Sequence, residues 1–95
     1  MTAEAELFDA LKYRVVVDRY GTRRYYNDAG QLHREDGPAV MWRDGSLEWY
    51  HNGLRHREDG PAAEYADGTR LWYLNGRPHR TNGPTIELPG GIKEW

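Results

Sequence analysis

Three of the four histidines belong to one motif that occurs nearly three times, each copy beginning 23 residues after the previous one. The copies are His33-Arg34-Glu35-Asp36-Gly37-Pro38-Ala39, His56-Arg57-Glu58-Asp59-Gly60-Pro61-Ala62 and the looser His79-Arg80-Thr81-Asn82-Gly83-Pro84-Thr85. An imidazole beside carboxylates could act in acid–base catalysis or bind a metal ion. A catalytic group is needed only once, however, whereas these histidines recur with the period of the sequence. We therefore expect His33, His56 and His79 to hydrogen-bond or pack within a repeated turn.

The same spacing argues against a metal site. Zinc needs ligands that converge at about 2.1 Å from one ion, whereas one histidine per copy keeps these rings apart, and the chain has no cysteine. We expect no metal and no other cofactor. His51 lies outside the pattern, because Leu74 takes its place one period later. A solvent-facing turn residue is the simplest interpretation of His51, and a pocket around it would instead favour an enzyme.

The fourth position of the motif carries a hydrogen-bond acceptor in every copy, namely Asp36, Asp59 and Asn82. Because asparagine can replace aspartate there, the position needs an acceptor and not a charge, which argues against a general base. We expect an Asx turn, in which the side chain accepts nearby backbone N–H groups. The proline two residues later fixes φ and cannot donate to a ladder, so it predicts the start or edge of a strand.

Length and composition indicate one small domain, residues 1–95. The chain is 38% hydrophobic and 29% charged, without an apolar run long enough to span a membrane. Residues 1–9 contain acids and no basic residue, which does not fit a signal peptide. We expect a cytoplasmic protein, in the host cytoplasm if a bacteriophage encodes it. The net charge of −2 argues against broad phosphate binding.

Short strands separated by tight turns should position the motifs. Each period contains an Asp-Gly and an Asn-Gly pair between strand-like runs, and such pairs favour type I′ hairpin turns with positive φ at both central residues. The sequence predicts an all-β fold: a single elongated, twisted antiparallel sheet of tandem β-hairpin repeats with a short N-terminal α-helix. The predicted parts are the helix at 2–12, a degenerate first unit at 13–38, full repeats at 39–61 and 62–84, and a partial repeat at 85–95.

Aromatic residues follow the same period. Trp49, Trp72 and Trp95 recur at intervals of 23 residues and should form a ladder along the sheet, beside a second ladder of Val40, Ala63 and Ile86. We expect these two ladders to form the core.

A family resemblance follows from Tyr50-His51-Asn52-Gly53-Leu54-Arg55-His56 with Gly60, Tyr65 and Asp67-Gly68. This pattern resembles the MORN repeat, a β-hairpin repeat found in tandem, and the likeness covers about residues 20 to 95. The usual His-Gly-x-Gly is replaced here by His56-Arg57-Glu58-Asp59-Gly60. This variant, ending in Asp-Gly-Pro-Ala, looks like units in small bacterial and bacteriophage-encoded proteins. The resemblance implies a hairpin-repeat fold and no single function.

Two surfaces are candidates for binding. The first is an exposed C-terminal edge strand, because an open edge presents unpaired backbone groups to another chain. Its residues are Ile92, Lys93, Glu94 and Trp95. The second is a basic and aromatic face, in which arginines beside tyrosine could contact phosphates and stack on bases. Its residues are Arg19, Arg23, Arg24, Tyr25, Arg34 and Arg57.

Acidic residues interleave with these arginines, so we favour a solvated face over a nucleic-acid or membrane surface. The pattern as a whole predicts a non-catalytic protein-binding module that uses the edge strand for another protein or for self-association. By analogy with the phage-encoded units, the most specific version of this prediction is a protein that inhibits a bacterial host or defence protein, of the anti-CRISPR type. The alternative is a lipid or nucleic-acid binder that uses the arginine and tyrosine face.

Overall fold

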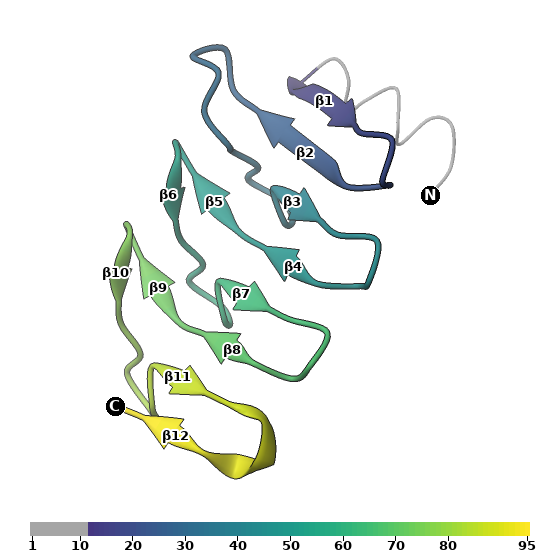
Figure 1. The fold of residues 1–95 in the computed structure, drawn as a ribbon. Helices are drawn as coiled ribbons and strands as arrows, with labels where there is room; N and C mark the ends of the chain where they lie inside the picture. The colour runs from purple at the N-terminus through teal and green to yellow at the C-terminus, as the bar shows by residue number, and fades with distance from the viewer. Residues whose placement is uncertain (1–11) are drawn as a thin grey trace.

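The computed structural model describes residues 12–95, and the predicted N-terminal helix lies outside them apart from its last residue. These residues form an all-β structure (Figure 1). The strands are β1 (Arg14–Val17), β2 (Arg23–Tyr26), β3 (Val40–Met41), β4 (Leu47–Glu48), β5 (Tyr50–His51), β6 (Leu54–Arg55), β7 (Ala63–Glu64), β8 (Arg70–Leu71), β9 (Tyr73–Leu74), β10 (Arg77–Pro78), β11 (Ile86–Glu87) and β12 (Lys93–Glu94). A short 3-10 turn, η1 (Pro89–Gly91), precedes β12. No helix in the described part of the chain is long and apolar enough to cross a membrane.

Eight strands form one antiparallel sheet in the order β1-β2-β3-β4-β7-β8-β11-β12. The hairpins β5–β6 and β9–β10 stand outside it as separate two-stranded sheets along one side of the molecule (Figure 1). The prediction of a single sheet is therefore wrong in this detail. The backbone changes partners at Trp49, whose N–H donates to the carbonyl of Ala62 at 2.7 Å, so that β4 pairs with β7 and β5 pairs with β6.

The two kinds of turn differ in conformation. Asn52 and Asn75 have φ of 49°, and the glycines that follow them also have positive φ, as the predicted type I′ turn requires. At Asp44-Gly45 only the glycine has positive φ, and the N–H of Trp42 donates to the carbonyl of Ser46 across a three-residue loop. The predicted type I′ turn is wrong there. Oδ1 of Asp44 accepts the N–H of Ser46 at 2.8 Å, which stabilises the alternative loop.

Small residues occupy most of the core. Ala39, Ala62, Ala63 and Tyr25 have no exposed surface, and Val40 is almost fully buried. Trp49 and Trp72 are only half-buried, and Trp95 is exposed, so the predicted tryptophan ladder is not the core. In residues 12–95 no second layer packs on the sheet to enclose an indole, so Trp49 and Trp72 lie on its surface under other side chains.

Candidate functional site

Each copy of the motif places its arginine on an aromatic ring that precedes it in the chain. The guanidinium carbon lies 4.0 Å from the ring centre of Tyr25 for Arg34, 3.9 Å from Trp49 for Arg57 and 3.7 Å from Trp72 for Arg80. Contacts this short are cation–π stacks. Trp49 and Trp72, predicted as structural positions, therefore act as platforms for arginine.

The glycine three residues after each arginine allows this packing. A Cβ at Gly60 would lie 2.9 Å from Cζ of Arg57, and a Cβ at Gly83 would lie 2.8 Å from Cζ of Arg80. The guanidinium then donates to the carbonyl of the proline one residue further on, at 3.1 Å from Arg57 to Pro61. The arginine is thus held between a ring, a glycine and a carbonyl, which accounts for the Arg-x-x-Gly-Pro pattern.

The histidines of the first two copies connect neighbouring parts of the fold. Nδ1 of His33 accepts the backbone N–H of Asn52 at 2.9 Å, and Nδ1 of His56 accepts that of Asn75 at 2.9 Å. Each bond holds an Asn-Gly turn against the preceding motif. Because a backbone N–H only donates, Nδ1 must carry no proton, so each neutral ring is protonated on Nε2.

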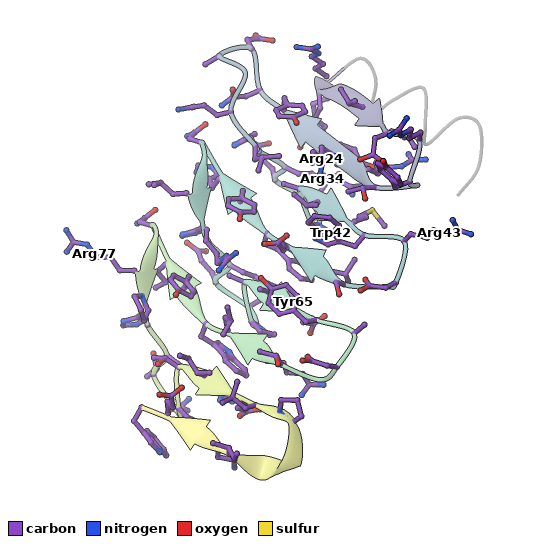
Figure 2. The ribbon with its side chains drawn as sticks, viewed as in Figure 1. Arg24, Arg34, Trp42, Arg43, Tyr65 and Arg77 are labelled. Carbon is purple, nitrogen blue, oxygen red and sulfur yellow. The ribbon has the colours of Figure 1, made fainter. Side chains whose placement is uncertain are left out.

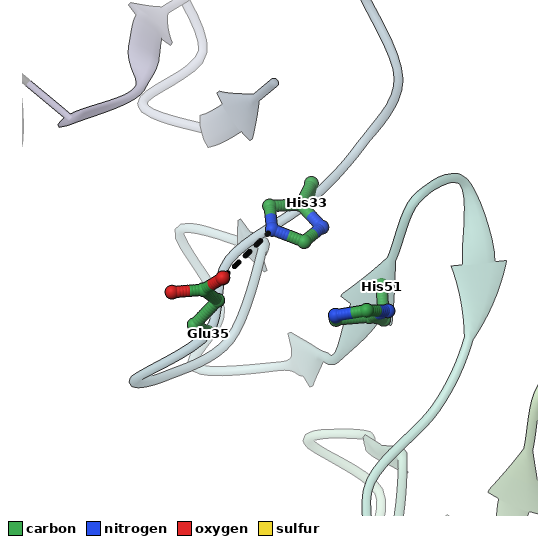
Figure 3. Close-up of side chains that lie close together, drawn as sticks. All are labelled: His33, Glu35 and His51. Atoms are coloured by element: carbon green, nitrogen blue, oxygen red, sulfur yellow. Dashed lines mark ion pairs between the residues drawn. The ribbon is translucent and has the colours of Figure 1, made fainter.

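The first of these bonds brings the unrepeated His51 next to His33, with ring centres 4.7 Å apart. His51 also lies 5.7 Å from the ring of His56. The carboxylate of Glu35 is 3.8 Å from Nε2 of His33, so one ligating atom each from His33, Glu35 and His51 falls within 4.8 Å of the others (Figure 3). Sequence reasoning missed this cluster, since the contact depends on the bond to Asn52.

The donor set of this cluster does not fit a metal ion. A metal on Nε2 of His33 needs that nitrogen without its proton, yet Nδ1 already serves as an acceptor and cannot take the proton without losing the bond to Asn52. Nζ of Lys12 also lies 3.0 Å from Oε2 of Glu35. Burial, followed by the neighbouring His51, lowers the pKa of His33. The contacts of His33 and Glu35 therefore argue against zinc binding by this cluster.

A hollow of about 970 Å³ lies beside this cluster, and its lining includes His51, His56 and the two motif loops. Side chains in its wall have partners close by: Arg57 and Asp59 form an ion pair, whereas His56, which is neutral, lies beside Glu58. Nε of Arg57 is 3.0 Å from Asp59, and Nε2 of His56 is 3.6 Å from Glu58. Asp36 and Asp59 thus each contact the arginine two residues earlier, at 3.4 Å and 3.0 Å, and the predicted Asx turn stays a prediction.

One member of the predicted basic and aromatic face lies below the surface, and two others are engaged in contacts within the chain. Tyr25 has no exposed surface, because it lies beneath Arg34. Arg24 pairs with Asp18 at 2.9 Å and lies over the ring of Trp42. Of the remaining members, Arg19 and Arg23 belong to the β1–β2 hairpin, whereas Arg57 belongs to the second motif loop. Figure 2 shows other arginines, Arg43 and Arg77, extending from opposite sides of the molecule.

Sequence reasoning also missed a polar network around Glu48, which is only 7% exposed. Its carboxylate accepts the indole N–H of Trp42 at 2.7 Å and a guanidinium N–H of Arg55 at 2.8 Å. The hydroxyls of Tyr50 and Tyr65 also donate to it, each at 3.3 Å. The sequence does hold one indication that this position is buried, because the equivalent residue one period later is the apolar Leu71.

The C-terminal edge is the most exposed apolar part of the described sheet. Ile92 is 60% exposed and Trp95 is 83% exposed, on either side of the two residues of β12. Within residues 12–95, β12 pairs only with β11, through Ile86 opposite Glu94 and Glu87 opposite Lys93. Of the four predicted edge residues, Lys93 and Glu94 form β12, and Ile92 and Trp95 flank it.

Comparison of the chain with known proteins gave no match to a family model, to a curated protein or to a solved structure.

Proposed function

We propose that this chain is a non-catalytic protein-binding module, built of MORN-like hairpin repeats, that captures an extended segment of another protein along β12. The observation that carries the proposal is the open edge of β12 flanked by the exposed Ile92 and Trp95. Backbone groups on such an edge supply affinity, and the alternating side chains supply specificity.

The hydrogen-bond pattern identifies which backbone groups are available. The N–H of Leu88 donates to the carbonyl of Ile92 at 2.7 Å, so Ile92 and Glu94 face β11. Because antiparallel ladders alternate, the amides of Lys93 and Trp95 face the open edge. A partner strand would therefore bind these two amides.

The charges on β12 disfavour pairing with a second copy of this chain about either of its two residues, Lys93 and Glu94. Two copies of β12 could pair as antiparallel strands about a twofold axis perpendicular to the sheet. Directly opposite side chains point to the same face, whereas neighbours along a strand point to opposite faces, so the axis must pass between two copies of the same residue. An axis at Lys93 or at Glu94 places like charges directly opposite, which is destabilising. We expect the purified protein to be monomeric by light scattering.

The test uses a synthetic peptide with the sequence of residues 79–88, which contains the strand that pairs with β8 in the intact chain. Titrated into the full chain, it should slow hydrogen exchange of the Lys93 and Trp95 amides. Lys93→Pro removes one outward N–H, and the extended backbone of Ile92 (φ −72°, ψ 133°) accepts a following proline. The variant should lose binding, whereas Lys93→Thr should keep it.

Unchanged exchange at both amides up to millimolar peptide would refute capture by this edge. Equal binding by the proline variant would do the same. If β12 binds the peptide, the chain could inhibit a host defence protein by pairing β12 with an edge strand of that protein.

A further inference from the structure

Trp95 is the fourth member of a series of aromatic rings, and each of the three earlier rings carries an arginine. Trp49 and Trp72 precede it at intervals of 23 residues, and the ring of Tyr25 has the same role in the first unit. In the part of the chain that the structure describes, no guanidinium lies over Trp95, which is 83% exposed. The π face that holds an arginine elsewhere is thus open to solvent here.

The strand next to Trp95 belongs to the same series. β12 is equivalent to β8 and β4, which lie one and two periods earlier. Each of those strands is paired, on the side that β12 leaves open, with the strand that follows a motif loop: β11 beside β8 and β7 beside β4.

The backbone repeats this relation. The N–H of Trp72 donates to the carbonyl of Thr85 at 2.9 Å, and that of Trp49 donates to Ala62 at 2.7 Å. In each case the loop that leads into the accepting strand supplies the arginine on the same indole. Strand pairing and ring stacking therefore occur together at both tryptophans.

We infer that the partner segment captured by β12 carries an arginine that stacks on Trp95, within an Arg-x-x-Gly turn leading into the paired strand. The inference rests on the proposed function and specifies the partner's chemistry. Arginine suits the site because its planar guanidinium stacks on an indole and still donates to a carbonyl, as Arg80 does to Pro84 at 3.1 Å. Glycine three residues later leaves room for the guanidinium, as Gly83 does for Arg80.

The experiment compares two peptides with the sequence of residues 79–88, one native and one with Arg80→Gln, bound to the full chain. Affinity is measured by calorimetry, and the indole N–H signal of Trp95 is followed by NMR. A cation–π contact is worth about 0.5–2 kcal/mol, so the arginine peptide should bind about 2- to 30-fold more tightly. It should also shift the Trp95 signal more than the glutamine peptide does.

A Trp95→Leu chain is the matched control, because it keeps an apolar side chain and removes the ring. On this chain the two peptides should bind equally. Equal affinity of the two peptides for the unaltered chain would overturn the arginine inference and leave edge pairing intact. Absence of binding by both peptides would overturn edge pairing itself, and the inference with it.

Discussion

Protonation of His33 should loosen the contact between the first motif and the turn at Asn52. Its pKa is lowered by burial and then by His51, so the unfolded chain binds this proton more readily than the folded one. The stability that the neutral ring provides is complete above the ordinary histidine pKa of about 6.5 and is lost progressively as pH falls below it. Glu35, 3.8 Å from Nε2, partly opposes this effect by favouring the charged ring.

The magnitude follows from the bond that is lost. Nδ1 of a protonated ring is a donor and repels the Asn52 N–H, which it accepts at 2.9 Å in the folded chain. Loss of one such hydrogen bond costs about 0.5–1.5 kcal/mol. For a domain of this size, each kcal/mol lowers the melting temperature by about 4–8 °C.

The assay is thermal unfolding of the full chain between pH 7.5 and pH 5, with amide exchange at Asn52 followed in parallel. His33→Asn places an amide oxygen near the position of Nδ1 and cannot titrate, so its melting temperature should fall less over this range. His79→Asn is the control, because within residues 12–95 no backbone N–H donates to the His79 ring as those of Asn52 and Asn75 do to His33 and His56. If His33→Asn keeps the full pH dependence of the unaltered chain, the proposed role of His33 is refuted.

Two further substitutions test the contacts that hold the units together. Arg57→Gln should lower the free energy of unfolding by about 1–2 kcal/mol in urea titrations, because it removes the stack on Trp49 and the bond to Pro61. A loss no larger than that of an exposed Arg43→Gln would contradict this role. Glu48→Gln should cost about 3 kcal/mol, since it leaves the guanidinium of Arg55 partly buried beside a neutral amide. Glu87→Gln, which breaks the more exposed pair with Arg80, should cost less, and the reverse order would count against the buried network.

The sequence was sufficient for features that depend on neighbouring residues. The Asn-Gly pairs place positive φ where the two short hairpins turn, because asparagine and glycine tolerate the left-handed region that other residues avoid. The 23-residue spacing and the strand-like runs between turns were enough to predict an all-β chain. They also predicted a strand near the end of the given sequence, where the structure has β12 at Lys93–Glu94.

Contacts between units were decided only by the tertiary structure. The bond from Asn52 to His33 joins residues 19 apart, and its direction, which fixes the tautomer and draws His51 into the cluster, has no local signature. The alternation that predicts which residues face inward could not show that a carboxylate, Glu48, would be buried with four donors around it. Such contacts depend on how one hairpin is placed against the next, and sheet register and twist set that placement, not the residues adjacent in the chain.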